Sequence, residues 1–448
     1  MSLVFKSLYR LDRLGSWAWR WVQQRFTLPG LTILGTLMVA GVMGTDTDNN
    51  VAYQGFTVLF FLLLVAAGFS ISFRARFSAR RLLPRFGTVG CPLNYSVRVQ
   101  NLTAKPQAGL SLLENLADSR PSFQDWLAVQ LADKKQARSF RFSQRRRTNP
   151  FKKAVLKGAP IPTIAPKQQS EVQLEVTPLR RGMLRFASLL VARPDPFGLF
   201  RALARVPLPE TVLILPKRYP LPPIALPGTM KYQEGGVALS SSVGQSDEFV
   251  ALRDYRHGDP LRHIHWRSWA RTGKPVVKEF EDEFFVRHAL VLDTFTQQPH
   301  SEVFEEAVSV AASFACTVLT QESLLDLLFV GTQSYCFTAG RGLAHADQML
   351  EVLASVQTCA NQPFGTLEHL VLNHSQVVSG CICILLAWDE ARREFVSKLK
   401  ALGIPVLVLV IVEHGQNKSL DPGPLREEPD RFRVLEVGQI EPELAKLG

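Results

Sequence analysis

Two uninterrupted apolar runs near the start of the chain predict helices that enter a membrane. Residues 26–44 carry no charge, and a second apolar run covers 51–73. As a helix the first run is ~28 Å long at about 1.5 Å per residue, close to the hydrocarbon thickness of a bilayer. The polar residues between the runs predict a tight turn, and hence a transmembrane hairpin over 26–73. A cleaved signal peptide is the alternative, opposed by the second run and by the long charged segment before the first.

Residues 1–25 interleave cations with leucine and tryptophan, a pattern typical of an amphipathic segment at a membrane interface. The cations that flank the apolar runs predict the orientation of the hairpin. They are Lys6, Arg10, Arg13, Arg20 and Arg25 before it, and Arg74, Arg76, Arg80 and Arg81 after it. The connecting turn has none, so the positive-inside rule places both ends of the hairpin in the cytoplasm.

The pattern changes to short alternating runs between residues 82 and 215. Apolar and polar residues alternate with period two, and Pro, Gly or Asn bounds each run. This pattern predicts antiparallel strands in a small β-sandwich. The following residues 216–245 are rich in Pro, Gly and Ser and predict a linker or a loop packed against its neighbours.

Apolar strand patterns alternate with helical patterns from residue 286 to the end at 448. Such alternation predicts a parallel, doubly wound α/β sheet. The predicted fold class is therefore α/β plus β: a helical hairpin, a β-sandwich and an α/β domain.

The net charge of +11 is concentrated in one insert of the predicted sandwich. Residues 134–157 hold ten Lys and Arg residues and no acid, so the rest of the chain is close to neutral. This distribution argues against a nucleic-acid-binding protein. We expect lipid contact through Arg145, Arg146, Arg147, Lys152 and Lys153, with a solvated loop as the alternative. The six cysteines form no CxxC pair, which favours free thiols in a reducing compartment.

Residues 246–285 form the most unusual stretch of the chain. Arginine, histidine, tryptophan and acidic residues are mixed there without a run of one charge. Because an unpaired buried charge is costly, this composition predicts a network of ion pairs and aromatic packing that fixes one surface.

This stretch resembles the signature of the bacterial domain-of-unknown-function family fifty-eight. The matching elements are Phe249, Leu252, Arg253, Tyr255, Gly258, Asp259, Arg262, Ile264, Trp266, Ala270, Arg271, Lys278, Glu279 and Phe280. The segment 193–200, RPDPFGLF, also resembles this family. The resemblance implies a membrane-anchored protein of the bacterial inner membrane, multi-pass, with its soluble domains facing the cytoplasm. It also implies a von Willebrand A-like fold over 286–448 and companions such as MoxR-type AAA+ ATPases and other membrane or von Willebrand A proteins.

A von Willebrand A domain holds Mg²⁺ at the ends of its strands, and the resemblance places this site at Asp293, Thr294 and Asp389. Oxygen ligands of this kind suit magnesium. Phe295 and Gln297 stand where the pattern needs hydroxyl ligands, so we expect a degenerate site without a cofactor, magnesium being the ion that a working site would hold.

We therefore expect a scaffold or interaction protein rather than an enzyme, working with a MoxR-type ATPase in assembly or chaperone-like activity. The expected partner-binding residues are Arg253, Tyr255, Gly258, Asp259, Arg262, Trp266, Arg271, Lys278 and Glu279. A metal-dependent hydrolase is the alternative, using Asp259 with His257, His263 and His265, since three histidines can hold Zn²⁺. A third hypothesis is an anion-binding module in which the arginines bind phosphate or lipid head groups.

Overall fold

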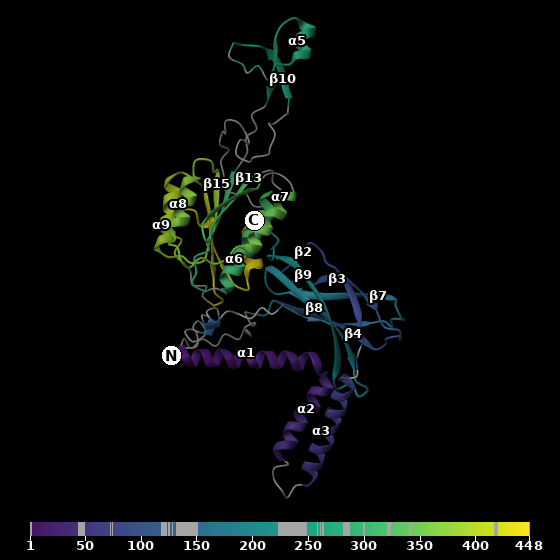
Figure 1. Ribbon diagram of the computed structural model, residues 1–448. Coiled ribbons are helices and arrows are strands. Elements are labelled where there is room, and N and C mark those ends of the chain that lie inside the picture. The colour runs from purple at the N-terminus through teal and green to yellow at the C-terminus, as the bar shows by residue number, and fades with distance from the viewer. Residues whose placement is uncertain are drawn as a thin grey trace. The chain divides into compact units, whose positions relative to one another are not determined.

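The computed structural model describes residues 2–43, 50–71, 73, 75–117, 123, 126–127, 129–130, 151–222, 249–257, 259, 261, 264–280, 287–298, 301–319, 324–339, 343–415 and 420–447. They form a mixed α/β fold with several sheets (Figure 1). The chain divides into two compact units. The first comprises Met1–Lys217, Gln298–His300 and Glu351–Val356, and the second Arg218–Gln297, Ser301–Leu350 and Gln357–Gly448.

Three helices open the first unit: α1 (Ser2–Arg25), α2 (Leu28–Met43) and α3 (Asn50–Ile71). Within the described chain, one helical segment, Val51–Ile71 of α3, is long and apolar enough to cross a membrane. Its length and composition indicate membrane association. The apolar α2 has only 16 residues and packs against α3, with Gly41 facing the ring of Phe56. The two-span hairpin therefore stays a prediction.

Two sheets follow in the first unit, with the strand orders β1-β3-β7-β5 and β2-β9-β8-β4-β6. Their bounds are β1 (Phe77–Leu82), β2 (Phe86–Thr88), β3 (Leu93–Asn101), β4 (Leu110–Leu116), β5 (Ala154–Lys157), β6 (Ala159–Ile161), β7 (Gln169–Pro178), β8 (Gly182–Pro194) and β9 (Arg201–Leu215). Neighbouring strands are antiparallel except β2 and β9, which are parallel. Val97 and Leu174 of one sheet share a buried core with Leu112 and Phe186 of the other, so the sheets pack face to face.

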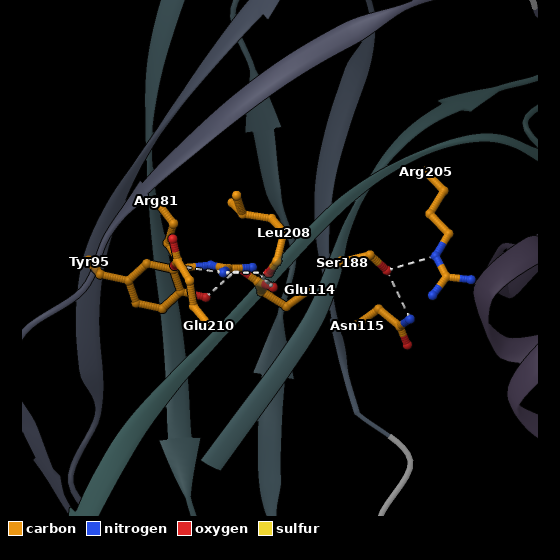
Figure 2. A network of polar contacts seen from close by, with 8 residues as sticks. All are labelled: Arg81, Tyr95, Glu114, Asn115, Ser188, Arg205, Leu208 and Glu210. Atoms are coloured by element: carbon orange, nitrogen blue, oxygen red, sulfur yellow. Dashed lines mark hydrogen bonds and ion pairs between the residues drawn. The ribbon is translucent and has the colours of Figure 1, made fainter. Parts of the chain in front are cut away.

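A buried ion cluster joins these sheets across that core (Figure 2). Arg81 of β1 donates from Nε and Nη2 to the two carboxylate oxygens of Glu114 on β4, each at 3.0 Å. Its Nη1 donates to Glu210 at 2.9 Å, and the hydroxyl of Tyr95 donates to Glu114 at 2.8 Å. Arg81 also lies over the ring of Phe186. Burial and the Glu114 carboxylate both raise the pKa of Tyr95, so this hydroxyl stays a donor.

Arg81, which is counted from the sequence among the cations that follow the second apolar run, is thus a core residue of the sandwich. The side chains of β1 alternate between the two faces of their sheet, and Arg81 lies on the inner face with only 4% of its surface exposed. Arg76 and Arg80 are not buried and keep their place beside the apolar helices.

The loop between β8 and β9 is held by one buried carboxylate and contacts the apolar helices. Asp195 accepts hydrogen bonds from the amides of Phe197, Leu199 and Phe200 at 3.0, 2.7 and 2.6 Å. The amide of Thr27 donates to the carbonyl of Leu199 at 3.1 Å. A Cβ on Gly30 would lie 2.0 Å from that carbonyl oxygen, so only glycine permits the approach.

The main sheet of the second unit has the order β14-β13-β12-β15-β16-β17 and is parallel except for β14. Its strands are β12 (Arg287–Leu292), β13 (Leu324–Val330), β14 (Ser334–Ala339), β15 (Gly380–Leu385), β16 (Val406–Val412) and β17 (Phe432–Glu436). The helices are α6 (Glu302–Leu319), α7 (Leu343–Ser355), α8 (Gly365–Asn373), α9 (Glu390–Ala401) and α10 (Ile440–Leu444), with the 3₁₀ turns η2 (Gly423–Leu425), η3 (Pro429–Arg431) and η4 (Ala445–Leu447).

Helices cover both faces of this sheet, as alternation of strands and helices predicts (Figure 1). Ala289 and Val291 of β12 share a core with Leu367 of α8 and Phe395 of α9. The intervening residues of β12 lie on the opposite face, where α6 packs. The von Willebrand A assignment within this α/β class stays a prediction.

The predicted linker 216–245 lies largely outside the described residues. Its first part is packed rather than free. Tyr219 is buried, its amide donates to Ser313 of α6 at 2.8 Å, and its hydroxyl donates to Glu306 at 2.6 Å. The chain is therefore fixed to α6 directly after it enters the second unit.

Candidate functional site

The signature stretch forms a small module of two strands and one short helix. Strands β10 (Phe249–Asp254) and β11 (Val276–Phe280) pair antiparallel, and α5 (Trp266–Thr272) lies between them in sequence. His265 caps the start of α5, because its Nδ1 accepts from the amide of Ser268 at 3.3 Å and lies 2.7 Å from the Ser268 hydroxyl. Gly273 ends the helix with φ 68°, a conformation suited to glycine. We name these residues, 249–280, the signature module.

An ion pair fixes the turn that follows β10. Arg253 donates from Nη1 and Nη2 to the two oxygens of Asp259 at 2.7 and 2.8 Å. The amide of Arg256 donates to Asp259 as well, at 2.8 Å. The Arg253 hydrogen bonds, followed by that of the Arg256 amide, lower the pKa of Asp259 to about 2. Both oxygens of the Asp259 carboxylate therefore accept hydrogen bonds that hold the turn, and the pair with Arg253 is one of the charge pairs expected for this stretch.

This pair makes the order of the module dependent on pH. The pKa of Asp259 falls from 3.8 to about 2 on folding, so its stabilising effect is complete above pH 3.8 and is lost as the pH falls through about 2. We expect the amides of β10 and β11 to lose hydrogen-exchange protection over this interval in the full chain. Asp259→Asn should weaken that protection at neutral pH and remove its acid dependence. Acid protection profiles that coincide for parent and variant would contradict this role.

The outer side of the module exposes large apolar side chains. Trp266 is 62% exposed and stacks on Trp269, with ring centroids 5.2 Å apart. Leu261 and Leu252 are exposed nearby in sequence. Sequence reasoning named Trp266 but omitted Trp269 and Leu261. The spacing of three between the tryptophans is the available signal, since residues i and i+3 share one face of a helix.

The structure places the remaining predicted partner-binding residues as follows. Arg271 is exposed at the end of α5, Lys278 is half-buried on β11, and Tyr255 is half-buried with its amide donating to the carbonyl of Pro275. Gly258 and Arg262 lie outside the described residues, as does the side chain of Glu279. His263 is also outside them, and His265 serves as the helix cap.

The predicted metal residues lie at the carboxyl end of the parallel sheet of the second unit. Asp293 follows β12 and is fully buried, while Asp389 follows β15 and caps α9. A guanidinium joins the two carboxylates: Arg392 donates to Asp293 and to Asp389, both at 2.6 Å. The amides of Phe295 and Leu386 donate to the two Asp293 oxygens at 2.9 and 3.1 Å. Sequence reasoning missed Arg392, whose place one turn into α9 carries no obvious signal.

These residues do not fit a magnesium site. Mg²⁺ needs oxygen ligands in near-octahedral geometry, and the oxygens of Asp293 already accept from two amides and a guanidinium. The hydroxyl of Thr294 donates to the carbonyl of Val330, which turns it away from that role. Arg392 supplies the positive charge that the two acids require. Across the described chain, no three His, Cys, Asp or Glu side chains gather closely enough to hold a metal.

The predicted lipid-contact residues fall in two groups. Arg145, Arg146 and Arg147 lie outside the described residues. Lys152 and Lys153 are described and exposed just before β5, where the carbonyl of Lys153 accepts from the amide of Leu179. Lipid contact by the basic insert stays a prediction.

Comparison with known proteins bears on the signature module and the α/β sheet. A family model described as "Protein of unknown function DUF58" matches residues 251–423. The resemblance to this family is confirmed over that range. The chain is also similar to "Uncharacterized protein YeaD" of Bacillus subtilis (strain 168), with 30% identity over 201 residues. That alignment covers 44% of this chain and 48% of the relative, so the chain matches about half the length of this curated protein.

Solved structures add nothing to the argument. A CARDB domain from Pyrococcus furiosus is 14% identical with a TM-score of 0.18, covering 31% of this chain and 94% of that one. A β-glucosidase from Listeria innocua is 13% identical with a TM-score of 0.17, covering 31% of this chain and 16% of that one. Scores this low carry no conclusion about fold or function.

Proposed function

We propose that this chain is a membrane-associated interaction protein whose signature module binds a partner protein. The observation that carries the proposal is the exposed Trp266, stacked on the half-buried Trp269, in a module whose turn is fixed by the Arg253–Asp259 pair. Tryptophan and arginine dominate the energetics of protein interfaces, and Trp266, Leu261 and Arg271 are each exposed in this short segment. The Arg253–Asp259 pair keeps the backbone of the module ordered before a partner arrives.

The partner class comes from the family resemblance. By the family resemblance of its signature, this chain looks like a companion of MoxR-type AAA+ ATPases. This resemblance supports a role in assembly or chaperone-like activity at a bacterial inner membrane. The apolar α3 supports membrane attachment, and the cations around it, including Arg76 and Arg80, support soluble units that face the cytoplasm.

The alternative of a metal-dependent hydrolase receives no support from the arrangement of its residues. Asp259 gives both oxygens to Arg253 and the Arg256 amide, and His265 gives its Nδ1 to Ser268. Asp259 would have to give up these hydrogen bonds in order to bind a metal or activate water.

Replacing Trp266 by alanine tests the docking proposal. We expect the variant to bind a co-expressed MoxR-type ATPase at least about 30-fold more weakly, since hot-spot tryptophans cost about 2 kcal/mol or more when truncated. Affinity would be measured by surface plasmon resonance on the detergent-purified full chain, with and without nucleotide. Trp266 is a suitable target because its side chain is mostly exposed, whereas Arg253→Ala would disturb the turn itself.

Leu402→Ala is the matched control, an exposed apolar side chain in the second unit that follows α9. Its affinity for the ATPase should equal that of the parent. The docking proposal is abandoned if the parent binds no ATPase of this type, or if both variants bind as the parent does.

A further inference from the structure

The surface of α1 is divided into an apolar and a polar face. At ~3.6 residues per turn, Leu11, Leu14 and Trp21 share one face, with Leu8 and Trp19 at its edge. Tyr9, Arg13 and Arg20 share the opposite face. Leu11 and Leu14 are more than 60% exposed, and Trp17 and Trp19 more than 50%. In the part of the chain that the structure describes, this apolar face is left uncovered along most of the helix.

Within the described residues, α1 contacts the rest of the protein through Tyr9 and through its C-terminal end, where Trp21 closes the apolar face. Tyr9, on the polar face, packs its ring against Phe123 and Trp126, with centroids 5.5 and 5.6 Å away. At the C-terminal end Trp21 contacts Phe200 at 6.3 Å, and Arg25 lies over the same ring. In the described part of the chain, α1 is therefore held through Tyr9 and through its C-terminal end, while Leu11, Leu14 and Trp19 between them are exposed.

The position of α1 along the chain identifies what covers this face. Arg25, at the end of α1, donates to the hydroxyl of Ser70 at the end of α3. The start of α2 and the end of α3 therefore lie at one level, and that level is the boundary at which α3 leaves the hydrocarbon. Only Phe26 and Thr27 separate α1 from α2. An amphipathic helix at this level lies at the surface of the membrane itself.

The β8–β9 loop reaches the same level. Leu199 and Phe200 are buried against Ala66 of α3 and Ile33 of α2, and Ala66 lies five residues before the end of α3. The loop thus extends ~8 Å along α3 at about 1.5 Å per residue. At its tip, Phe197 has a side chain that is 51% exposed, while its own amide and that of Leu199 donate to Asp195.

We infer that α1 lies flat in the head-group layer of the membrane that α3 enters, with its apolar face in lipid and Phe197 inserted beside it. This inference rests on the membrane attachment in the proposed function. Tryptophan is enriched at this depth because its ring is both apolar and a hydrogen-bond donor. The cations Lys6, Arg10, Arg13, Arg20 and Arg25 against the single Asp12 favour anionic head groups.

Depth-dependent quenching of tryptophan fluorescence tests the inference. The full chain would be reconstituted into phosphatidylglycerol-containing vesicles with bromine near the head group or at the end of the acyl chain. We expect bromine near the head group to quench the tryptophan fluorescence of the parent more strongly than bromine at the end of the acyl chain does. The triple variant Trp17→Phe, Trp19→Phe, Trp21→Phe should lose most of that quenching. Trp266→Phe is the control: it removes an exposed tryptophan far along the chain, and this variant should be quenched as strongly as the parent. Adding Phe197→Trp to the triple variant should restore part of the lost quenching.

Sedimentation of the vesicles after an alkaline wash separates this inference from the anchor. If the chain sediments with the vesicles but the triple variant is quenched like the parent, α1 is not in lipid and the inference is overturned while the anchor stands. If the chain is washed off, the anchor and the inference both fail. Absence of restored quenching with Phe197→Trp overturns the role of the loop.

Discussion

Replacing Glu114 by alanine is expected to destabilise the β-sandwich by about 3–5 kcal/mol, because it leaves the Arg81 guanidinium buried without its principal counter-charge. Arg81 is 4% exposed, and both of its parallel hydrogen bonds to Glu114 would disappear. Glu210 is one-third exposed and holds a single nitrogen of the guanidinium, so it cannot compensate. The loss would be measured as reduced protection of the β3 and β4 amides in urea-dependent hydrogen exchange on the full chain.

Two controls show whether the loss comes from the unpaired charge. Glu171 forms an exposed pair with Arg98 that solvent screens, so Glu171→Ala should destabilise the sandwich far less than Glu114→Ala does. The combined variant Arg81→Met, Glu114→Leu, Tyr95→Phe removes both charges and the hydroxyl that would lose its acceptor, and should recover most of the stability. If Glu114→Ala is as mild as Glu171→Ala, the cluster does not stabilise the sandwich.

Replacing Arg392 by alanine should destabilise the α/β sheet by a comparable amount, about 3–5 kcal/mol. Asp293 is fully buried and would keep two amide donors but lose its cation. Arg392 also lies over the ring of Phe364, so packing is lost together with charge. The expected readout is a loss of hydrogen-exchange protection in β12 and β15. The neighbouring exposed Arg393→Ala should stay within about 0.5 kcal/mol of the parent.

The effect of added Mg²⁺ on stability shows whether Asp293 and Asp389 are paired with Arg392 or hold a metal ion. Millimolar Mg²⁺ should leave protection of β12 unchanged in the parent, because Arg392 already neutralises the acids. In Arg392→Ala the same ion should restore part of the lost protection, since Asp293 and Asp389 then face each other without a cation. Stabilisation of the parent by Mg²⁺ would show that the ion displaces the arginine, contrary to the site described above.

The local patterns in the sequence were sufficient to predict most elements. Strict alternation in 93–101 gives β3, and apolar runs separated by helical patterns give β12, β15 and β16. These predictions hold because burial on one face of a strand or helix repeats with a fixed period. The pairing of Arg81 with Glu114 was not predictable, because the two residues lie 33 positions apart on different sheets. In the sequence alone, an arginine that follows an apolar helix is interpreted as a surface cation even when its side chain faces the core of the next domain.

The candidate site divides in the same way. The Arg253–Asp259 pair spans six residues of one turn, so the mixed charges of the stretch were enough to anticipate an ion pair there. The bond between Asp293 and Arg392 joins residues 99 positions apart. No local rule relates them, and only the folded sheet brings the start of α9 over the end of β12. Sequence reasoning therefore found the acids of this site and missed the cation.

The long β8–β9 hairpin connects two places that are distant from each other. Its strands pair from Gly182–Ile214 to Pro194–Arg201, so twelve residues separate the two ends of β8, about 40 Å at ~3.3 Å per residue. One end carries the loop that contacts α2 and α3, and the other leads through Leu215 towards the second unit. The ladder between β8 and β9 is interrupted by one register shift, between Phe186 and Ser188, and a bulge of this kind bends a strand and increases its twist. A displacement of the loop at the apolar helices is therefore expected to be taken up at this bulge, so that the far end of the strands moves less than a rigid rod would.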